Sequence, residues 1–222
     1  MPASDDTSLA VGVIILAAGA SRRMGRPKLL LSWGQTSVLG QLLQECKALK
    51  VRQVAVVCAA GAQPLVEELN RLGFPESDRI VNPAPDRGMF SSIQCAANWT
   101  NWNAELTHFL IMLGDQPHLR IETLRELLEF SAKNPHKICQ PLRNGRRKHP
   151  VLLPARNFAE LKSTSAADLK LFLVAHASEL SGFESADAGL DLDMDTPEDY
   201  ERVKRMYFGP KGNNSSFASG FA

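Results

Sequence analysis

The chain has 222 residues, 44% of them hydrophobic, and its 25 basic and 24 acidic side chains leave a formal net charge of +1 at pH 7. This length suits one sizeable domain, and the balanced charge gives no overall field that would attract nucleic acid or a membrane surface. Any anion site must therefore be local. The longest apolar stretch, Val11–Ala18, is too short to cross a bilayer, so we expect a soluble, cytoplasmic protein that binds neither nucleic acid nor membrane.

Short apolar segments alternate with amphipathic ones along the chain. Their periodicity predicts strands at Val11–Ala17, Val54–Cys58, Ile80–Val81, His108–Leu113, Ile138–Gln140, Val151–Leu153 and Leu190–Met194. The predicted helices are Ser37–Lys50, Pro64–Gly73, Met89–Trp99, Ile121–Lys133, Arg156–Lys162 and Asp168–Ser178, and a last helix follows the capping box Thr196–Asp199.

This order of elements predicts an α/β fold with a doubly wound, mostly parallel sheet that can include antiparallel strands. In such sheets ligands bind beyond the carboxyl ends of the strands, which is where functional residues are to be sought. The segments 1–10 and 209–222 are rich in small and polar residues. We expect them to be flexible ends of a single domain at 11–208.

The first predicted strand runs into the stretch LAAGASRRMGRPK at residues 16–28. Its small residues allow close approach to a ligand, and consecutive amides there can form an anion-binding nest next to the basic side chains. The spacing matches neither the P-loop nor the dinucleotide GxGxxG pattern. On this stretch alone, a phosphate site and a solvated basic loop are equally open.

Acidic residues follow two later strands. Asp115 comes directly after HFLIML, within GDQP, and Asp191, Asp193 and Asp195 alternate along the last predicted strand. Alternation would point these three to one face, where they repel one another unless a cation lies opposite. Asp115 alone could equally serve a turn or a helix cap. Carboxylates at two strand ends facing a basic loop together predict a Mg²⁺–nucleotide site.

Two further loops carry polar groups. The turn Asp86–Ser92 opens a helix and has hydroxyls and amides available for a ligand. The basic loop Arg143–Pro150, hairpin-like in composition, contains His149 and precedes the strand VLLP. An ordinary charged turn and a polar rim histidine would explain the second loop equally well.

These motifs, in this order, resemble the molybdenum-cofactor nucleotidyltransferase family within the wider sugar-nucleotide transferase superfamily. The resemblance covers residues 11 to about 207 and rests on LAAGASRRMGRPKLLLSWG, NPAPDRGMFSSI, GDQP, KHPVLLP and DMDTPEDY. It implies a Rossmann-like nucleotidyltransferase fold and Mg²⁺-dependent attack of a substrate phosphate on the α-phosphorus of an NTP, with release of pyrophosphate. The form LAAG resembles the cytidylyl branch, which implies CTP as donor and molybdopterin as acceptor.

Carried onto matching positions, the resemblance implies roles for individual residues. Lys28 would neutralise charge on the α-phosphate, and Asp115 would bind Mg²⁺ with either Asp195 or Asp193. Lys28 and Asp115 would be the catalytic residues. The nucleotide would contact Leu16, Ala17, Ala18, Gly19, Ser21, Arg22, Arg23, Gly25, Lys28, Asn82, Gly88, Met89, Ser92 and Gly114. His149, Gln116 and Pro117 would face the acceptor.

The chain departs from the family pattern in two loops that would face the acceptor. Lys148 stands where relatives have a glycine before His-Pro, and STSAADLK occupies residues 163–170 in place of a Gly-Ala-Arg segment. Other readings therefore stay open: a sugar phosphate or small phospho-acid as acceptor, a GTP-using molybdopterin guanylyltransferase, or a nucleotide-binding module without turnover. The joint presence of Lys28, Asp115 and Asp195 argues against the last. Transient contact with a molybdoenzyme or its chaperone is expected.

Overall fold

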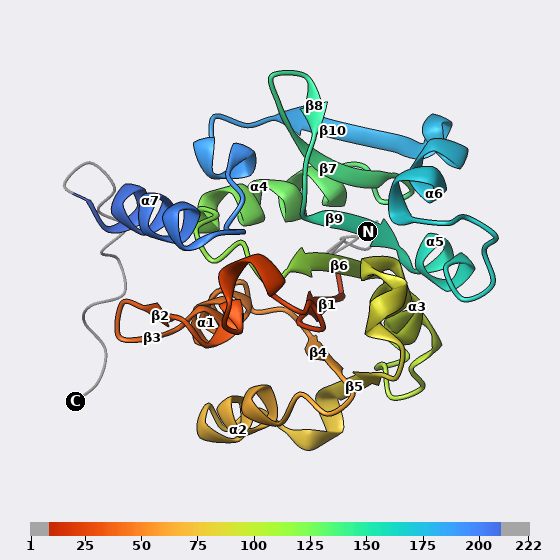
Figure 1. The fold of residues 1–222 in the computed structure, drawn as a ribbon. Helices are drawn as coiled ribbons and strands as arrows, with labels where there is room; N and C mark the ends of the chain where they lie inside the picture. Colours follow the sequence, from red (N-terminus) through yellow and green to blue (C-terminus); the bar gives the residue numbers. More distant parts are fainter. Residues whose placement is uncertain (1–8, 210–222) are drawn as a thin grey trace.

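The computed structural model describes residues 9–209. The predicted flexible segments 1–10 and 209–222 lie outside the described residues except for residues 9, 10 and 209. The main sheet has eight strands in the order β10-β7-β9-β6-β1-β4-β5, with β8 paired to β7 (Figure 1). The strands are β1 Val11–Leu16, β4 Gln53–Ala59, β5 Arg79–Asn82, β6 His108–Leu113, β7 Ile138–Arg143, β8 Arg146–Arg147, β9 Val151–Pro154 and β10 Leu180–Glu184.

Strand β1 lies in the middle of the sheet and pairs in parallel with β4 and β6. All six residues of its VGVIIL sequence are buried, as the continuous apolar run of a parallel strand requires. Strand β9 is antiparallel to both β6 and β7, while β10 is parallel to β7. The carboxyl ends of β1, β4, β5, β6, β7 and β10 therefore meet at one edge of a mixed, mostly parallel sheet, as predicted.

Helices cover both faces of this sheet (Figure 1). They are α1 Val38–Ala48, α2 Gln63–Arg71, α3 Met89–Asn98, α4 Ile121–Ala132, α5 Ala155–Glu160, α6 Leu169–Ala175 and α7 Pro197–Phe208. Val13 and Ile15 of β1 share a core with α1, α2 and α4, whereas Ile14 shares the opposite core with α3, α5 and α6. Because alternate strand residues face opposite sides, one strand serves both cores, and the doubly wound prediction is confirmed.

The predicted strand Leu190–Met194 is wrong. Residues Ala188–Asp191 form a 3-10 helix, η6, and the chain then runs without sheet pairing to the start of α7. The Asp187 side chain accepts a hydrogen bond from the Gly189 amide and so closes a tight turn where a strand was expected. The expectation that Asp191, Asp193 and Asp195 share one strand face is wrong for the same reason.

Strand β10 was not predicted, and it lies at one end of the sheet. Its residues are partly exposed and show no regular alternation of apolar and polar side chains, so the sequence carried no strand signal there. A small hairpin of β2 Ser32–Trp33 and β3 Thr36–Ser37 was also missed. It places Trp33 in a third core with α7.

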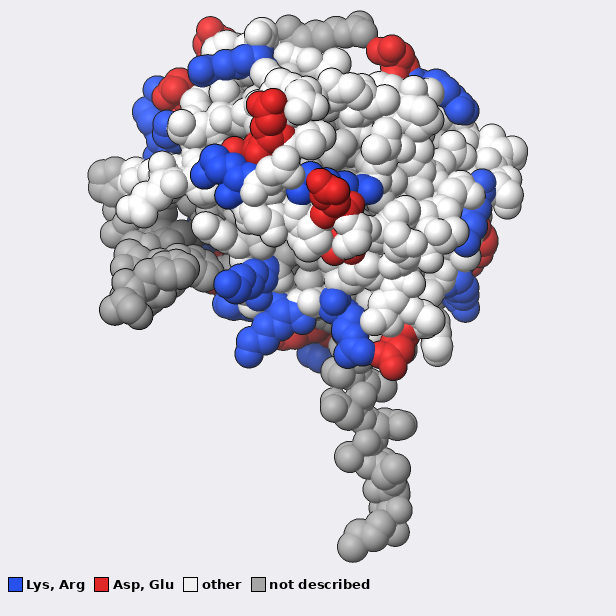
Figure 2. All heavy atoms as spheres, turned by 90° about the horizontal axis from the view of Figure 1, so that it is seen from below, with Lys and Arg blue, Asp and Glu red and all other residues white. Residues whose placement is uncertain are grey.

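The surface carries charges of both signs. On the face seen in Figure 2, basic and acidic side chains lie interspersed among uncharged ones. Within the described part of the chain, no helix combines the length and apolar character needed to span a bilayer.

Candidate active site

A cleft of about 890 Å³ lies at the carboxyl edge of β1, β4 and β6. The predicted nucleotide-binding residues that line it are Leu16, Ala17, Ala18, Gly19, Ser21, Gly25, Lys28, Gly88, Met89, Ser92 and Gly114, and Asp115 lines it too. The loop after β1 and the start of α3 thus face the same space, although some 60 or more positions separate them in the sequence. A pocket of this size can hold a nucleotide.

The loop after β1 folds back on itself. The Lys28 amide donates to Ser21 Oγ at 3.1 Å, and the Met24 amide donates to the Ser21 carbonyl at 3.0 Å. Ser21 itself has a positive φ of 48°, and Gly25 has a φ of 69°. Arg22 and Arg23 belong to the short 3-10 helix η1, Arg22–Met24. This closed turn returns Lys28 to the end of β1.

Gly114 brings the second strand end against the first. A Cβ atom at Gly114 would lie 2.5 Å from the Leu16 carbonyl oxygen, so only glycine allows this approach. Its amide donates to that same carbonyl at 3.1 Å. Asp115, the next residue, is therefore held beside the basic loop.

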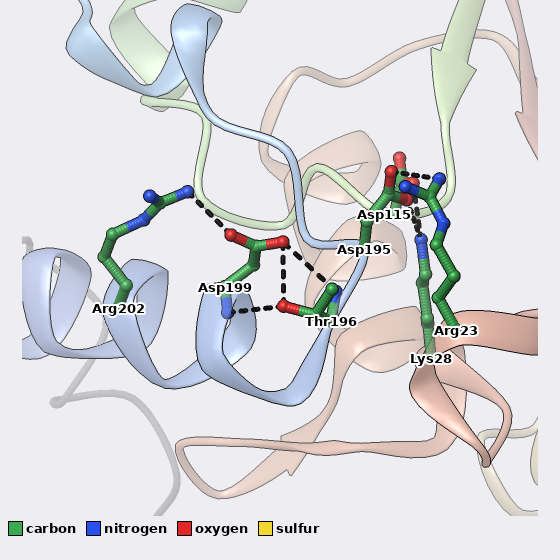
Figure 3. A network of polar contacts seen from close by, with 7 residues as sticks. All are labelled: Arg23, Lys28, Asp115, Asp195, Thr196, Asp199 and Arg202. Atoms are coloured by element: carbon green, nitrogen blue, oxygen red, sulfur yellow. Dashed lines mark hydrogen bonds and ion pairs between the residues drawn. The ribbon is translucent and has the colours of Figure 1, made fainter.

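Lys28 joins two carboxylates that come from distant parts of the chain (Figure 3). Its Nζ lies 2.5 Å from Asp195 Oδ1 and 3.3 Å from Asp115 Oδ2, and the Lys28 side chain is only 11% exposed. Arg23 forms an ion pair with the other oxygen of Asp195. The hydrogen bond from Lys28, together with the nearby positive charges, holds the pKa of Asp195 below its usual range. Two cations balance two carboxylates here.

Two buried residues that the sequence analysis missed hold the segment before Asp195 in place. Asp187 accepts hydrogen bonds from the Arg120 amide at 3.0 Å and from Thr123 Oγ1 at 2.8 Å. His118 Nε2 lies 3.1 Å from the Gly189 carbonyl, and burial lowers the pKa of His118. Neither residue stands in a recognisable motif, so only its burial reveals its positioning role.

The start of α7 fixes the other side of Asp195. Thr196 and Asp199 form the predicted capping box, with the Asp199 amide donating to Thr196 Oγ1 at 3.2 Å and the Thr196 amide donating to Asp199 Oδ2 at 3.2 Å (Figure 3). Arg202 pairs with the remaining Asp199 oxygen at 2.8 Å. Asp195 therefore projects from a junction that is anchored at both ends.

The three aspartates of this segment have different surroundings. Asp195 meets Lys28, while Asp191 pairs with Lys148 and Arg143. Asp193 is exposed between them. Of the two residues considered as second carboxylate beside Asp115, Asp195 is the one that shares a cation with Asp115.

Asn82 is not among the residues lining the cleft. It is 1% exposed, its Nδ2 donates to the hydroxyls of Ser91 and Ser92 at 2.8 and 2.9 Å, and its Oδ1 accepts from the Ala84 amide. This arrangement joins the end of β5 to the first turn of α3. Asn82 thus orients the turn that carries Gly88 and Met89 to the cleft.

The residues expected to face the acceptor are not among those that line the cleft. Burial lowers the pKa of His149 to about 4, although the charge of Asp115 acts in the opposite direction, so the imidazole is neutral at pH 7. Gln116 and Pro117 are buried next to Asp115 in the chain. Gln116 Oε1 and His149 Nδ1 have no hydrogen-bond partner among the described residues.

The carboxylate pair fits a hard divalent cation. Among the residues that the structure describes, no three His, Cys, Asp or Glu side chains gather into a self-sufficient metal site. Mg²⁺ keeps few protein ligands and is commonly held by one or two carboxylates together with substrate phosphates. Asp115 and Asp195, which already converge on one cation, meet that requirement.

The chain is similar to known proteins along most of its length. A family model described as the MobA-like NTP transferase domain matches residues 13–179. The molybdenum cofactor cytidylyltransferase of Escherichia coli is 27% identical over 201 residues, covering 89% of this chain and 97% of that protein. A probable molybdenum cofactor guanylyltransferase of Bacillus mycoides is 24% identical over 86% of this chain and 94% of its own length. The nicotine blue oxidoreductase of Paenarthrobacter nicotinovorans is 29% identical over 89% of this chain and 98% of its own length.

Solved structures share the fold. A nucleotidyl transferase from Methanothermobacter superposes with a TM-score of 0.72 at 20% identity, covering 89% of this chain and 97% of the other. A manganese complex of a Mycobacterium tuberculosis protein gives a TM-score of 0.68 at 24% identity, covering 88% of this chain and 98% of the other. The family match spans most of the described chain and includes the loop after β1, Asp115 and His149. This chain therefore belongs to the MobA-like NTP transferase family and is a nucleotidyltransferase.

Proposed function

We propose that this protein transfers CMP from CTP to molybdopterin and releases pyrophosphate. The observation that carries the proposal is the convergence of Lys28, Asp115 and Asp195 beside the cleft lined by the loop after β1. The likeness to a molybdenum cofactor cytidylyltransferase along 97% of that protein supports the choice of donor and acceptor.

In this proposal Asp115 and Asp195 hold Mg²⁺, which offsets negative charge on the nucleotide phosphates. A protein with the same fold that was solved in complex with manganese supports the use of a divalent ion. Lys28, released from the two carboxylates, places its ammonium against the α-phosphate. Negative charge there grows during transfer, so a fixed cation lowers the barrier more than it strengthens binding.

The remaining residues bind and orient the two substrates. Backbone amides from Leu16 to Gly25 hold the triphosphate, and Gly88, Met89 and Ser92 flank the nucleoside. A phosphate oxygen of the acceptor attacks the α-phosphorus, the bond to the bridging oxygen breaks, and pyrophosphate leaves with that electron pair. An acceptor phosphate that is already ionised needs no general base, so positioning and charge suffice.

We propose that residues 11–208 act as one catalytic domain. The sheet from β1 to β10 is continuous, and α7 packs on Trp33 in the same body as the cleft. The contact with a molybdoenzyme or chaperone stays a prediction.

Titration calorimetry with CTP, GTP and ATP, each with Mg²⁺, tests the donor. We expect CTP to bind at least about tenfold more tightly than GTP, a difference of about 1.4 kcal/mol. Tighter GTP binding would instead favour the guanylyl alternative, for which the Bacillus mycoides relative is the supporting observation.

Pyrophosphate release tests the acceptor. With CTP and Mg²⁺ present, release should require molybdopterin and should not occur with a sugar phosphate or a small phospho-acid. Release with one of those compounds and none with molybdopterin would reassign the acceptor. Nucleotide binding without release from any acceptor would identify a binding module.

A further inference from the structure

A second charged cluster lies at the same sheet edge, outside the cleft. Arg143 is the last residue of β7, Lys148 lies between β8 and β9, and Asp191 ends η6. Lys148 Nζ lies 2.7 Å from Asp191 Oδ1, and Arg143 Nε lies 3.4 Å from Asp191 Oδ2. Two cations from the β7–β9 connection thus converge on one carboxylate from another part of the chain.

This cluster has more positive than negative charge, and its anion is the most exposed member. The side chains of Arg143 and Lys148 are 27% and 26% exposed, whereas that of Asp191 is 40% exposed. The hydrogen bond from Lys148 lowers the pKa of Asp191, so the carboxylate is ionised at neutral pH. The Asp191 carboxylate contacts the two cations on their solvent side, where an incoming anion could replace it.

Polar groups next to the cluster lack partners. Gln140 is 4% exposed; its Nε2 donates to the Lys148 carbonyl at 3.0 Å, while its Oε1 is unpaired among the described residues. His149 Nδ1 is likewise unpaired, and Arg143 Nε lacks hydrogen-bond geometry despite its distance to Asp191. Buried polar atoms are normally satisfied, so unpaired atoms beside this cluster need an explanation.

The distance from the metal site decides which part of a ligand could lie here. Strand β9 separates β6, which carries Asp115, from β7, which carries Arg143. Neighbouring strands are about 4.8 Å apart, so the two strand ends are about 10 Å apart. An anion held at Arg143 therefore lies two strands away from the strand that carries Asp115. The cluster suits a different part of the same acceptor.

We propose that Arg143 and Lys148 bind a second anionic group of the acceptor, remote from the attacking phosphate, and that Asp191 occupies this site until the acceptor displaces it. This inference rests on the proposed function, because it assumes an acceptor that extends from Asp115 across β9. It makes Lys148 a specificity-determining residue of this chain.

The first test compares three substitutions by steady-state kinetics with molybdopterin at saturating CTP and Mg²⁺. Lys148→Gln should raise the acceptor KM at least about tenfold, with kcat and the CTP dissociation constant within about twofold of the parent protein. Asp191→Asn should lower the acceptor KM by about threefold or more, because it removes the internal competitor. Arg146→Gln, which removes an exposed charge from the same hairpin, is the matched control and should change neither.

Each alternative gives a distinct result. If the Lys148–Asp191 pair only ties two loops together, Asp191→Asn will raise the acceptor KM as Lys148→Gln does. If a general positive field attracts the acceptor, Arg146→Gln will cost as much as Lys148→Gln. An unchanged KM in Lys148→Gln would also overturn the proposal. Equal melting temperatures of the variants and the parent protein would show that none of these results comes from misfolding.

A second measurement separates failure of this site from failure of the proposed function. Inorganic phosphate is titrated by calorimetry into each protein with CTP and Mg²⁺ already bound, so that the nucleotide cleft is filled. We expect weak phosphate binding that Lys148→Gln abolishes and Asp191→Asn strengthens, whatever acceptor the enzyme uses. No phosphate binding to either the parent protein or Asp191→Asn would overturn the anion site even if molybdopterin is the substrate.

Discussion

At the scale of single residues, Lys28 is the group that joins the two carboxylates of the site. Its ammonium is nearly buried and meets both carboxylates, so the protein without ligand already holds a positive charge where a metal ion is proposed. In the proposed mechanism, Asp115 and Asp195 would hold Mg²⁺ and so leave the lysine to the phosphate. The same contact that keeps Asp115 and Asp195 together before binding thus supplies the charge needed afterwards.

Replacement of Lys28 by alanine should affect turnover more than binding. Many amides and the metal contribute to nucleotide binding, whereas the charge at the α-phosphate grows only in the transition state. We expect Lys28→Ala to lower kcat by about 10²–10³-fold and to change nucleotide affinity less than about tenfold. Arg23→Ala, which removes the more exposed partner of Asp195, should show a milder loss, mostly in KM. A Lys28→Ala variant that loses affinity but keeps its kcat would contradict the mechanism.

Replacement of Asp115 by asparagine tests the metal site with little change of shape. Asp115 is 34% exposed beyond the end of β6, so the substitution should leave the melting temperature within a few degrees. Loss of one anionic ligand should weaken Mg²⁺ binding and lower turnover by about 10²-fold or more. Activity measured across a Mg²⁺ series checks this expectation. An unchanged requirement at low Mg²⁺ would remove Asp115 from the site.

At the scale of elements, α1 and α7 meet around a buried acid that the reaction does not use. Glu45 of α1 is 3% exposed, its Oε1 accepts from Gln41 Nε2 at 2.9 Å, and Gln41 Nε2 also lies 3.3 Å from the hydroxyl of Tyr207 in α7. Burial raises the pKa of Glu45 to about 8 and that of Tyr207 to about 12. The contact between the two helices therefore contains a carboxyl that stays protonated at neutral pH.

This buried acid should make stability depend on pH. The pKa of Glu45 is raised in the folded protein, so from about pH 4.5 to about pH 8 the folded chain keeps a proton that the unfolded chain has lost. The free energy of unfolding should therefore fall as pH rises through this range, by up to about 1.4 kcal/mol per pH unit. Glu45→Gln cannot titrate and should remove this part of the slope.

Urea unfolding of both proteins near pH 5, 7 and 9 measures the difference. Subtraction of the two curves cancels the contribution of all other titrating groups. Parallel curves for the parent protein and Glu45→Gln would show that Glu45 is ionised when folded.

At the scale of the whole molecule, the cleft is assembled from parts that are far apart in the sequence. Lys28 is 87 residues from Asp115 and 167 residues from Asp195, yet its ammonium contacts both carboxylates. A ligand that bridges these parts binds the folded chain and not the unfolded one. Nucleotide binding should therefore stabilise the entire domain.

A thermal shift measures this coupling. CTP with Mg²⁺ at about 100 times its dissociation constant should stabilise the fold by about 2.7 kcal/mol, which raises the Tm of a domain of this size by about 5–10 °C. Chelation of the metal should remove most of the shift, because the proposed carboxylate pair then repels the triphosphate. CTP alone giving the full shift would argue against a metal between the phosphates and the carboxylates.

Much of the fold could be predicted because its signals are local. The buried VGVIIL run and the apolar face of α1 show their periodicity within a few residues, and the Thr196 capping box marks the start of α7. The wrong strand at Leu190–Met194 shows the limit of such signals. The side chain of Asp187 is held by Arg120 and Thr123, more than 60 residues away, and that contact selects a 3-10 turn.

The sequence by itself determined the alternation of strands and helices, and its resemblance to family motifs predicted Lys28 and Asp115 as residues of the main site. Only the tertiary structure decided that Asp195 joins them and that Asp191 pairs with Lys148 instead. Three aspartates at alternate positions look equivalent in the sequence. Their partners differ because the segment from η6 to α7 crosses two strand ends. Periodicity can be read within a few residues, but contacts between distant loops depend on how the whole chain has folded.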